Sequence, residues 1–215
     1  MVRKPWKRSG SLIGLKRLVY LISPDEIYKD FYTDLKDVLS SKKVKFFQLR
    51  LKKTPKNKII KISKKIRVIT KKFNVSFIVN DSVAIANLLG ASGCHIGQFD
   101  DSIDSAKKLL KKNKILGVTC HNSKKLAKNA LKKNVSYIAF GSFYKSKLKP
   151  LAKKSNLNIL KWAKKNTNKP IVAIGGINDK NYKKLINAGA NYIAISSFIW
   201  DNPILKPKQA IKKFK

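Results

Sequence analysis

Two carboxylates that each close a short apolar run are the residues in this sequence best suited to chemistry. Asp81 ends the run SFIVND and Asp100 ends GCHIGQFD, with a helix-like segment between them. If the two runs are neighbouring parallel strands, both carboxylates project from the same end of the sheet. Paired carboxylates suggest an oxygen-ligand site for a hard cation such as Mg²⁺. The alternative is that each Asp is the N-cap of the following helix.

Further polar residues lie near the end of an earlier apolar run, VKFFQLRLK. Strand alternation places Gln48, Arg50 and Lys52 on one face. A buried cation needs a partner, and a phosphate or diphosphate would supply one, with Arg50 able to bind it in a bidentate manner. The alternative is that Arg50 pairs with Asp81 in the core.

A second anion site is indicated near the C-terminus. Gly175 and Gly176 follow one apolar run, and Ser196 and Ser197 end the next. Backbone N–H groups and a helix N-terminus hold phosphate at such positions in barrel enzymes. The polar, Lys-rich segment 141–150 is suited to a lid or is an ordinary loop. Of the two histidines, His121 follows a strand-like run and is the better placed for proton transfer.

Short apolar runs alternate with helical segments along the whole chain. The runs are continuous and rich in β-branched residues, as in parallel strands buried on both faces. The expected strands are 17–23, 44–51, 76–81, 93–98, 114–120, 136–143, 170–176 and 191–198. The expected helices are 25–40, 54–72, 82–90, 102–112, 122–133, 154–166, 179–188 and 203–213.

Eight strands that are each followed by a helix predict a (β/α)₈ TIM barrel. The runner-up is an open doubly wound sheet, but the glycine-rich turn of that fold is absent after the first strand. The 215 residues predict one barrel domain over 17–215, preceded by a basic arm over 1–16. No secretion signal or membrane span is indicated, and Cys94 and Cys120 are expected to be buried free thiols in the cytoplasm.

The net charge of +38 comes almost entirely from Lys residues spread over the expected helices. Nucleic-acid-binding proteins instead concentrate Arg and Lys on one face among aromatic residues. We therefore expect a Lys bias on solvated surfaces, attraction of phosphorylated small molecules and no specific nucleic-acid partner. A non-catalytic barrel that binds polyanions remains as an alternative function.

The chain resembles the thiamine phosphate synthase family, which also includes the thiazole tautomerase. The resemblance rests on motifs in order over about residues 17–200: LVYLIS, FFQLRLK, FIVND, GCHIGQFD, ILGVTCH, YIAFGSFYKSKLK, IVAIGGI and AGANYIAISS. It implies a Mg²⁺-assisted transferase that joins hydroxymethylpyrimidine diphosphate to a thiazole phosphate. Diphosphate would depart first, leaving a pyrimidine-methyl cation for the thiazole nitrogen to capture.

The resemblance also implies roles for individual residues. Asp81 and Asp100 would hold Mg²⁺, and Thr119 would lie near the pyrimidine. The diphosphate would be bound by Gln48, Arg50, Lys52, Asn80 and Lys149. The thiazole phosphate would be bound by Ser146, Gly176, Ser196 and Ser197.

Two departures from the family pattern bear on function. Leu148 replaces a usual hydroxyl residue of the lid, and Ser142 replaces a usual proline. The tautomerase relatives typically lack the metal carboxylates, so the presence of both favours the synthase. The tautomerase remains as an alternative because His121 lies where that enzyme would use a proton-transfer residue.

Overall fold

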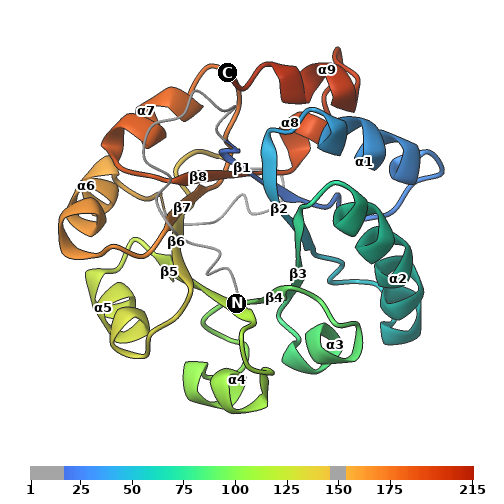
Figure 1. The fold of residues 1–215 in the computed structure, drawn as a ribbon. Helices are drawn as coiled ribbons and strands as arrows, with labels where there is room; N and C mark the ends of the chain where they lie inside the picture. The colour runs from blue at the N-terminus through green and yellow to red at the C-terminus, as the bar shows by residue number, and fades with distance from the viewer. Residues whose placement is uncertain (1–16, 146–153) are drawn as a thin grey trace.

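The protein, seen in a computed structural model that describes residues 17–145 and 154–215, is a closed eight-stranded barrel (Figure 1). All strand pairs are parallel and follow sequence order, and the last strand pairs with the first. The strands are β1 (Val19–Ile22), β2 (Val44–Leu49), β3 (Ser76–Asn80), β4 (Gly93–Ile96), β5 (Ile115–His121), β6 (Tyr137–Gly141), β7 (Ile171–Ile174) and β8 (Tyr192–Ile195). The (β/α)₈ prediction is therefore confirmed, and the open doubly wound sheet is excluded. The expected arm over 1–16 lies outside the described residues.

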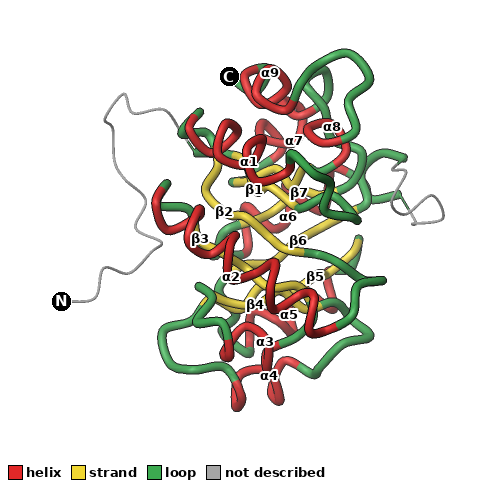
Figure 2. The backbone as a smooth tube through the Cα atoms, turned by 90° about the vertical axis from the view of Figure 1, so that its right-hand side faces the viewer, coloured by secondary structure: helices red, strands yellow, loops and turns green. Residues whose placement is uncertain are grey.

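Helices surround the barrel on its outside (Figures 1 and 2). They are α1 (Phe31–Ser40), α2 (Lys56–Lys72), α3 (Val83–Leu88), α4 (Ile103–Leu109), α5 (Lys124–Lys132), α6 (Leu157–Asn166), α7 (Tyr182–Ala188), α8 (Ser197–Trp200) and α9 (Pro207–Lys212). None of the helices in the described ranges is both long and apolar enough to cross a membrane.

The last expected strand, 191–198, was too long. Strand β8 ends at Ile195 because Ser196 leaves the extended conformation, with φ −131° and ψ −79°, and Ser197 begins α8. The first expected helix was also too long, since residues 25–30 form turns and α1 begins only at Phe31.

Buried side chains fill two layers. One layer lies between the strands and the helices, and the other fills the inside of the barrel. The inner layer includes Tyr20, Phe46, Ile78, Tyr137 and Val172. Because both faces of the strands are covered, the strands are mostly apolar, which explains the continuous runs in the sequence.

The barrel closes at a seam between β1 and β8. Val19 pairs with Ile193 and Leu21 with Ile195. Beyond the strands, Trp200 Nε1 donates a hydrogen bond to Ile22 O at 2.6 Å, and Ser196 Oγ donates to Ser23 O at 2.9 Å. Helices α8 and α9 lie beside α1 (Figure 1). Side chains from the C-terminal segment therefore reinforce the first strand.

Cys94 and Cys120 are both buried and free, as expected from the sequence. Burial raises the pKa of each thiol to about 12. The thiols therefore stay protonated at neutral pH and behave as core side chains.

Candidate active site

The polar residues predicted from the sequence gather at the carboxyl ends of the strands. Gln48 and Asn80 lie two residues beyond the inner-layer residues Phe46 and Ile78, so alternation points them into the barrel. Thr119 lies near the end of β5. In a parallel barrel all strand ends meet on one rim, which is where sites of this fold are built.

The two candidate metal ligands, Asp81 and Asp100, follow the neighbouring parallel strands β3 and β4, and Asp100 lies near enough to affect the pKa of Asp81. Burial is the main cause that raises the pKa of Asp81, the hydrogen bond and charge of Asp100 raise it further, and Lys52 opposes the shift. Asp81 has a positive φ of 64°, and its N–H donates to His95 O at 2.8 Å. This backbone conformation is uncommon for a residue other than glycine, and Asp and Asn adopt it more readily than most.

The N-cap alternative for these carboxylates is wrong. The caps are the next serines along the chain: Ser82 Oγ accepts from Ile85 N, and Ser102 Oγ accepts from Ser105 N. Asp100 Oδ2 instead accepts from Gly97 N at 2.7 Å, within its own loop. Neither carboxylate is therefore used to begin a helix.

The carboxylate pair fits a hard cation. Within the described residues no group of three or more His, Cys, Asp or Glu side chains could hold a metal. Two carboxylates suit Mg²⁺, which usually takes one or two from the protein and completes its octahedron with water and substrate phosphate oxygens. A cation at this position would also relieve the repulsion that contributes to the raised pKa of Asp81.

Two cations from the end of β2 accompany the pair. Lys52 Nζ lies 3.3 Å from Asp81 Oδ2, and Arg50 Nη1 lies 3.0 Å from Asp25 Oδ1. The alternative in which Arg50 pairs with Asp81 is therefore wrong. The Arg50 side chain is only 16% exposed, whereas Asp25 is 56% exposed. A ligand can displace this partner at little cost, because exposed ion pairs are weak.

The second predicted anion site is at the ends of β7 and β8. Gly175 and Gly176 both have positive φ, at 108° and 60°. A methyl group at 176 would collide with the backbone of Lys145, so glycine is required there. Ser196 follows the adjacent strand, and its hydroxyl is turned toward Ser23 O. Ser146 and Lys149, predicted to bind substrate, lie outside the described residues, as does the second half of the 141–150 segment.

The two histidines differ in position. His121 is exposed at the end of β5, with φ 49°, where the pairing with β6 shifts register. His95 instead points into the barrel, where Nε2 lies 2.8 Å from Thr119 Oγ1 and Nδ1 lies 2.8 Å from Tyr137 Oη. Sequence reasoning preferred His121 and missed this set. Alternation with Cys94 and Ile96, which face the outer layer, could have identified His95 as an inward residue of β4.

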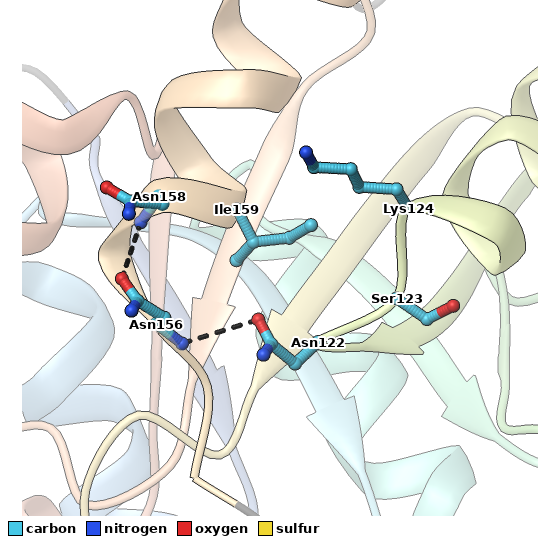
Figure 3. Close-up of a pocket in the computed structure, with 6 residues that line it drawn as sticks. All are labelled: Asn122, Ser123, Lys124, Asn156, Asn158 and Ile159. Carbon is cyan, nitrogen blue, oxygen red and sulfur yellow. Dashed lines mark hydrogen bonds between the residues drawn. The ribbon is translucent and has the colours of Figure 1, made fainter.

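A pocket of about 440 Å³ opens next to this rim, between the starts of α5 and α6 (Figure 3). Asn122, Ser123 and Lys124 line one side, and Asn156 N donates to Asn122 Oδ1 across it at 3.3 Å. The pocket contains none of the predicted site residues, so we place the chemistry at the strand ends rather than in this pocket.

Fold and site together define a class, that of barrel enzymes whose strand ends are built for phosphorylated small molecules. The model of the thiamine monophosphate synthase family matches residues 19–199. A thiamine-phosphate synthase from Pelagibacter ubique is 54% identical over 93% of this chain and 97% of its own length. One from Erythrobacter litoralis is 37% identical over 85% and 87%.

Solved structures agree with the sequence relatives. The structure of thiamine phosphate pyrophosphorylase from Pyrococcus furiosus is 26% identical, has a TM-score of 0.81 and covers 93% of this chain and 94% of its own. The chain belongs to the thiamine monophosphate synthase family. It is an enzyme, a transferase that forms thiamine phosphate, and the resemblance noted in the sequence is confirmed.

Proposed function

We propose that the chain joins hydroxymethylpyrimidine diphosphate to a thiazole phosphate with the assistance of Mg²⁺, releasing pyrophosphate. The observation that carries this proposal is the contact of Asp81 with Asp100 beside Lys52 at the ends of neighbouring strands. Asp100 contributes to the raised pKa of Asp81, and two such neighbouring carboxylates suit a divalent cation rather than an organic anion.

Asp81 and Asp100 would hold the cation, which supplies charge stabilisation to the departing diphosphate oxygens when bound. Arg50 and Lys52 would bind the same diphosphate from the other side, together with Gln48, Asn80 and Lys149. The bond between the pyrimidine methyl carbon and the diphosphate oxygen breaks with its electron pair on oxygen. The thiazole nitrogen then donates its lone pair to that carbon, so no enzyme nucleophile is needed.

The thiazole phosphate would lie across the ends of β7 and β8. Gly176 follows β7, and Ser196 and Ser197 follow β8, which pairs with β7; Ser146 is the fourth member of the proposed set. Gly175 and Gly176 are both partly exposed, and backbone N–H groups at such a turn can bind an anion. Thr119 would face the pyrimidine from β5.

Neither alternative is favoured by a specific observation. For the tautomerase, His121 is exposed at the strand end, whereas the carboxylate pair supports the synthase. The polyanion-binding barrel leaves that pair unexplained. We further propose a single domain over 17–215 and, because both cysteines are buried free thiols, a cytoplasmic location.

The test is a coupling assay with the full chain and both substrates, following thiamine phosphate with and without EDTA. We expect product formation that EDTA abolishes and excess Mg²⁺ restores. Folded protein that forms no product would overturn the substrate assignment, and product that is insensitive to EDTA would overturn the role of the metal. Isomerisation of the carboxythiazole phosphate, lost in His121→Asn, would favour the tautomerase.

A further inference from the structure

A line of four hydrogen-bonded side chains crosses the inside of the barrel below the proposed site. Tyr20 Oη lies 2.6 Å from Tyr137 Oη, and Tyr137 Oη lies 2.8 Å from His95 Nδ1. His95 Nε2 lies 2.8 Å from Thr119 Oγ1. The four residues come from β1, β6, β4 and β5. The line therefore connects the floor of the barrel to the rim where the pyrimidine is proposed to bind.

The local structure is built to allow this line. Gly117 lies between His95 and Tyr137 in the strand register, and a methyl group there would overlap the Tyr137 phenol. Without it, the Tyr137 ring stacks on the His95 ring, with centroids 5.6 Å apart and planes at 17°. A glycine in the middle of a strand lowers stability. Gly117 nevertheless allows the His95 and Tyr137 rings to approach each other closely.

The protons that the two tyrosines carry determine which group donates in each of these hydrogen bonds. Burial raises the pKa of both tyrosines, so each keeps its proton. Within the described residues, Tyr137 is the hydrogen-bond partner of Tyr20 Oη. A buried hydroxyl proton left without an acceptor is costly, so Tyr20 donates to Tyr137. The Tyr137 proton is then directed to His95 Nδ1.

The direction of the next hydrogen bond, between His95 and Thr119, follows from that of the bond to Tyr137. With Nδ1 accepting, a neutral His95 carries its proton on Nε2 and donates it to Thr119 Oγ1. The Thr119 hydroxyl oxygen therefore accepts its hydrogen bond from His95. No acceptor for its own proton is found within residues 17–145 and 154–215, so that proton can be donated to a ligand.

We propose that Tyr137, acting through His95, is a positioning residue that fixes the Thr119 hydroxyl as a hydrogen-bond donor and so selects substrates that present an acceptor there, such as an unprotonated pyrimidine nitrogen. The inference rests on the proposed function, because it takes Thr119 to face the pyrimidine. Tyr137 and His95 touch no reacting atom in it. They determine which way a hydroxyl of the site points.

The first test needs no activity. The chain has two histidines, so ¹⁵N NMR of the imidazole nitrogens shows two rings, and His121→Asn assigns them. We expect His95 to carry its proton on Nε2 with Nδ1 as an acceptor, and to lose this preference in Tyr137→Phe. A proton on Nδ1 in the wild-type protein would overturn the proposal.

The second test compares Tyr137→Phe with Tyr20→Phe. Both variants remove the bond between the two tyrosines, but only Tyr137→Phe also removes the bond to His95. We expect Tyr137→Phe to lower kcat/KM for the pyrimidine diphosphate about tenfold, with a smaller loss in Tyr20→Phe and the KM for the thiazole phosphate unchanged. Equal losses in the two variants would overturn the role of Tyr137.

A third comparison uses Thr119→Val as the background. Once the hydroxyl is gone, Tyr137→Phe should have little further effect on kcat/KM. Additive losses would show that Tyr137 acts other than through Thr119. If the wild-type chain forms no thiamine phosphate, the proposed function fails, whereas the NMR result still decides the direction of the hydrogen bonds.

Discussion

Lys52 Nζ lies 3.3 Å from Asp81 Oδ2, which joins the cationic end of β2 to the carboxylate pair at the ends of β3 and β4. The Lys52 side chain is 52% exposed, so this contact is weak and exchangeable. Lys52 can therefore turn from the carboxylate to a diphosphate oxygen. The contact places the proposed anion ligand and the proposed metal ligand within one site.

Asp81→Asn should abolish metal-dependent activity and yet stabilise the metal-free protein. The pKa of Asp81 is higher in the folded protein than in the unfolded chain. At neutral pH the ionised Asp81 therefore lowers the free energy of unfolding, whereas below the pKa of the unfolded chain this destabilisation is absent. Asn removes the charge and tolerates the positive φ. We expect activity to fall at least about 100-fold and Tm without Mg²⁺ to rise by about 2–4 °C per kcal/mol gained.

Asp104→Asn is the matched control for this variant, because Asp104 is an exposed aspartate on α4 that pairs with Lys133. It should leave activity unchanged and move Tm little. Asp81→Asn protein with full activity in the presence of Mg²⁺ would rule out the carboxylate as a required ligand.

Arg50→Gln should raise the KM for the pyrimidine diphosphate by about 10- to 100-fold, the range for losing a charge-assisted hydrogen bond. The KM for the thiazole phosphate should stay the same. The control is Arg17→Gln, since Arg17 Nη1 donates to Asn74 O, just before β3 begins and so far from the rim. Steady-state kinetics with each substrate varied separately makes the distinction. An equal rise in both KM values would contradict diphosphate binding by Arg50.

Gly117→Ala should destabilise the protein, because the added methyl group overlaps the Tyr137 phenol in a filled barrel. Overpacking of this kind costs about 1–3 kcal/mol, which lowers Tm by about 2–4 °C per kcal/mol. Thermal unfolding of Gly117→Ala/Tyr137→Leu provides the check. The double variant should be more stable than the sum of the two single effects predicts. Strict additivity would mean that the methyl group is accommodated elsewhere.

The net charge of +38 should give weak, non-specific binding to polyanions. Affinity for duplex DNA of random sequence should fall steeply, by about 10³-fold or more, between about 50 and about 200 mM salt. Fluorescence anisotropy with two unrelated duplexes measures this. Sequence-dependent affinity that survives at the higher salt concentration would instead support the polyanion-binding alternative.

The barrel and its polar rim could be predicted from the sequence because they depend on local patterns. Continuous apolar runs mark strands that are buried on both faces, and the order of eight strand–helix units leaves few topologies. Strands β3 and β4 are parallel neighbours, so Asp81 and Asp100 follow strands that end on the same side of the barrel. Residues at the ends of strands that are neighbours in chain order could therefore be placed near one another from the sequence.

Contacts between distant elements could not be predicted in this way. The partner of Arg50 is Asp25, in a turn that was expected to be helical. The bond between Tyr20 and Tyr137 joins β1 to β6 across the barrel, so it depends on strand tilt and on the space left by Gly117. A sequence pattern shows which way a side chain points from its strand, but not which side chain it meets on the far side.

The seam between β1 and β8 has a consequence for how the chain is made. During synthesis β1 can pair with β2 early, but its other edge has to wait for β8 and for the indole of Trp200. An unpaired strand edge invites association with other chains. The nascent chain thus carries an exposed β1 edge until β8 and Trp200 have left the ribosome.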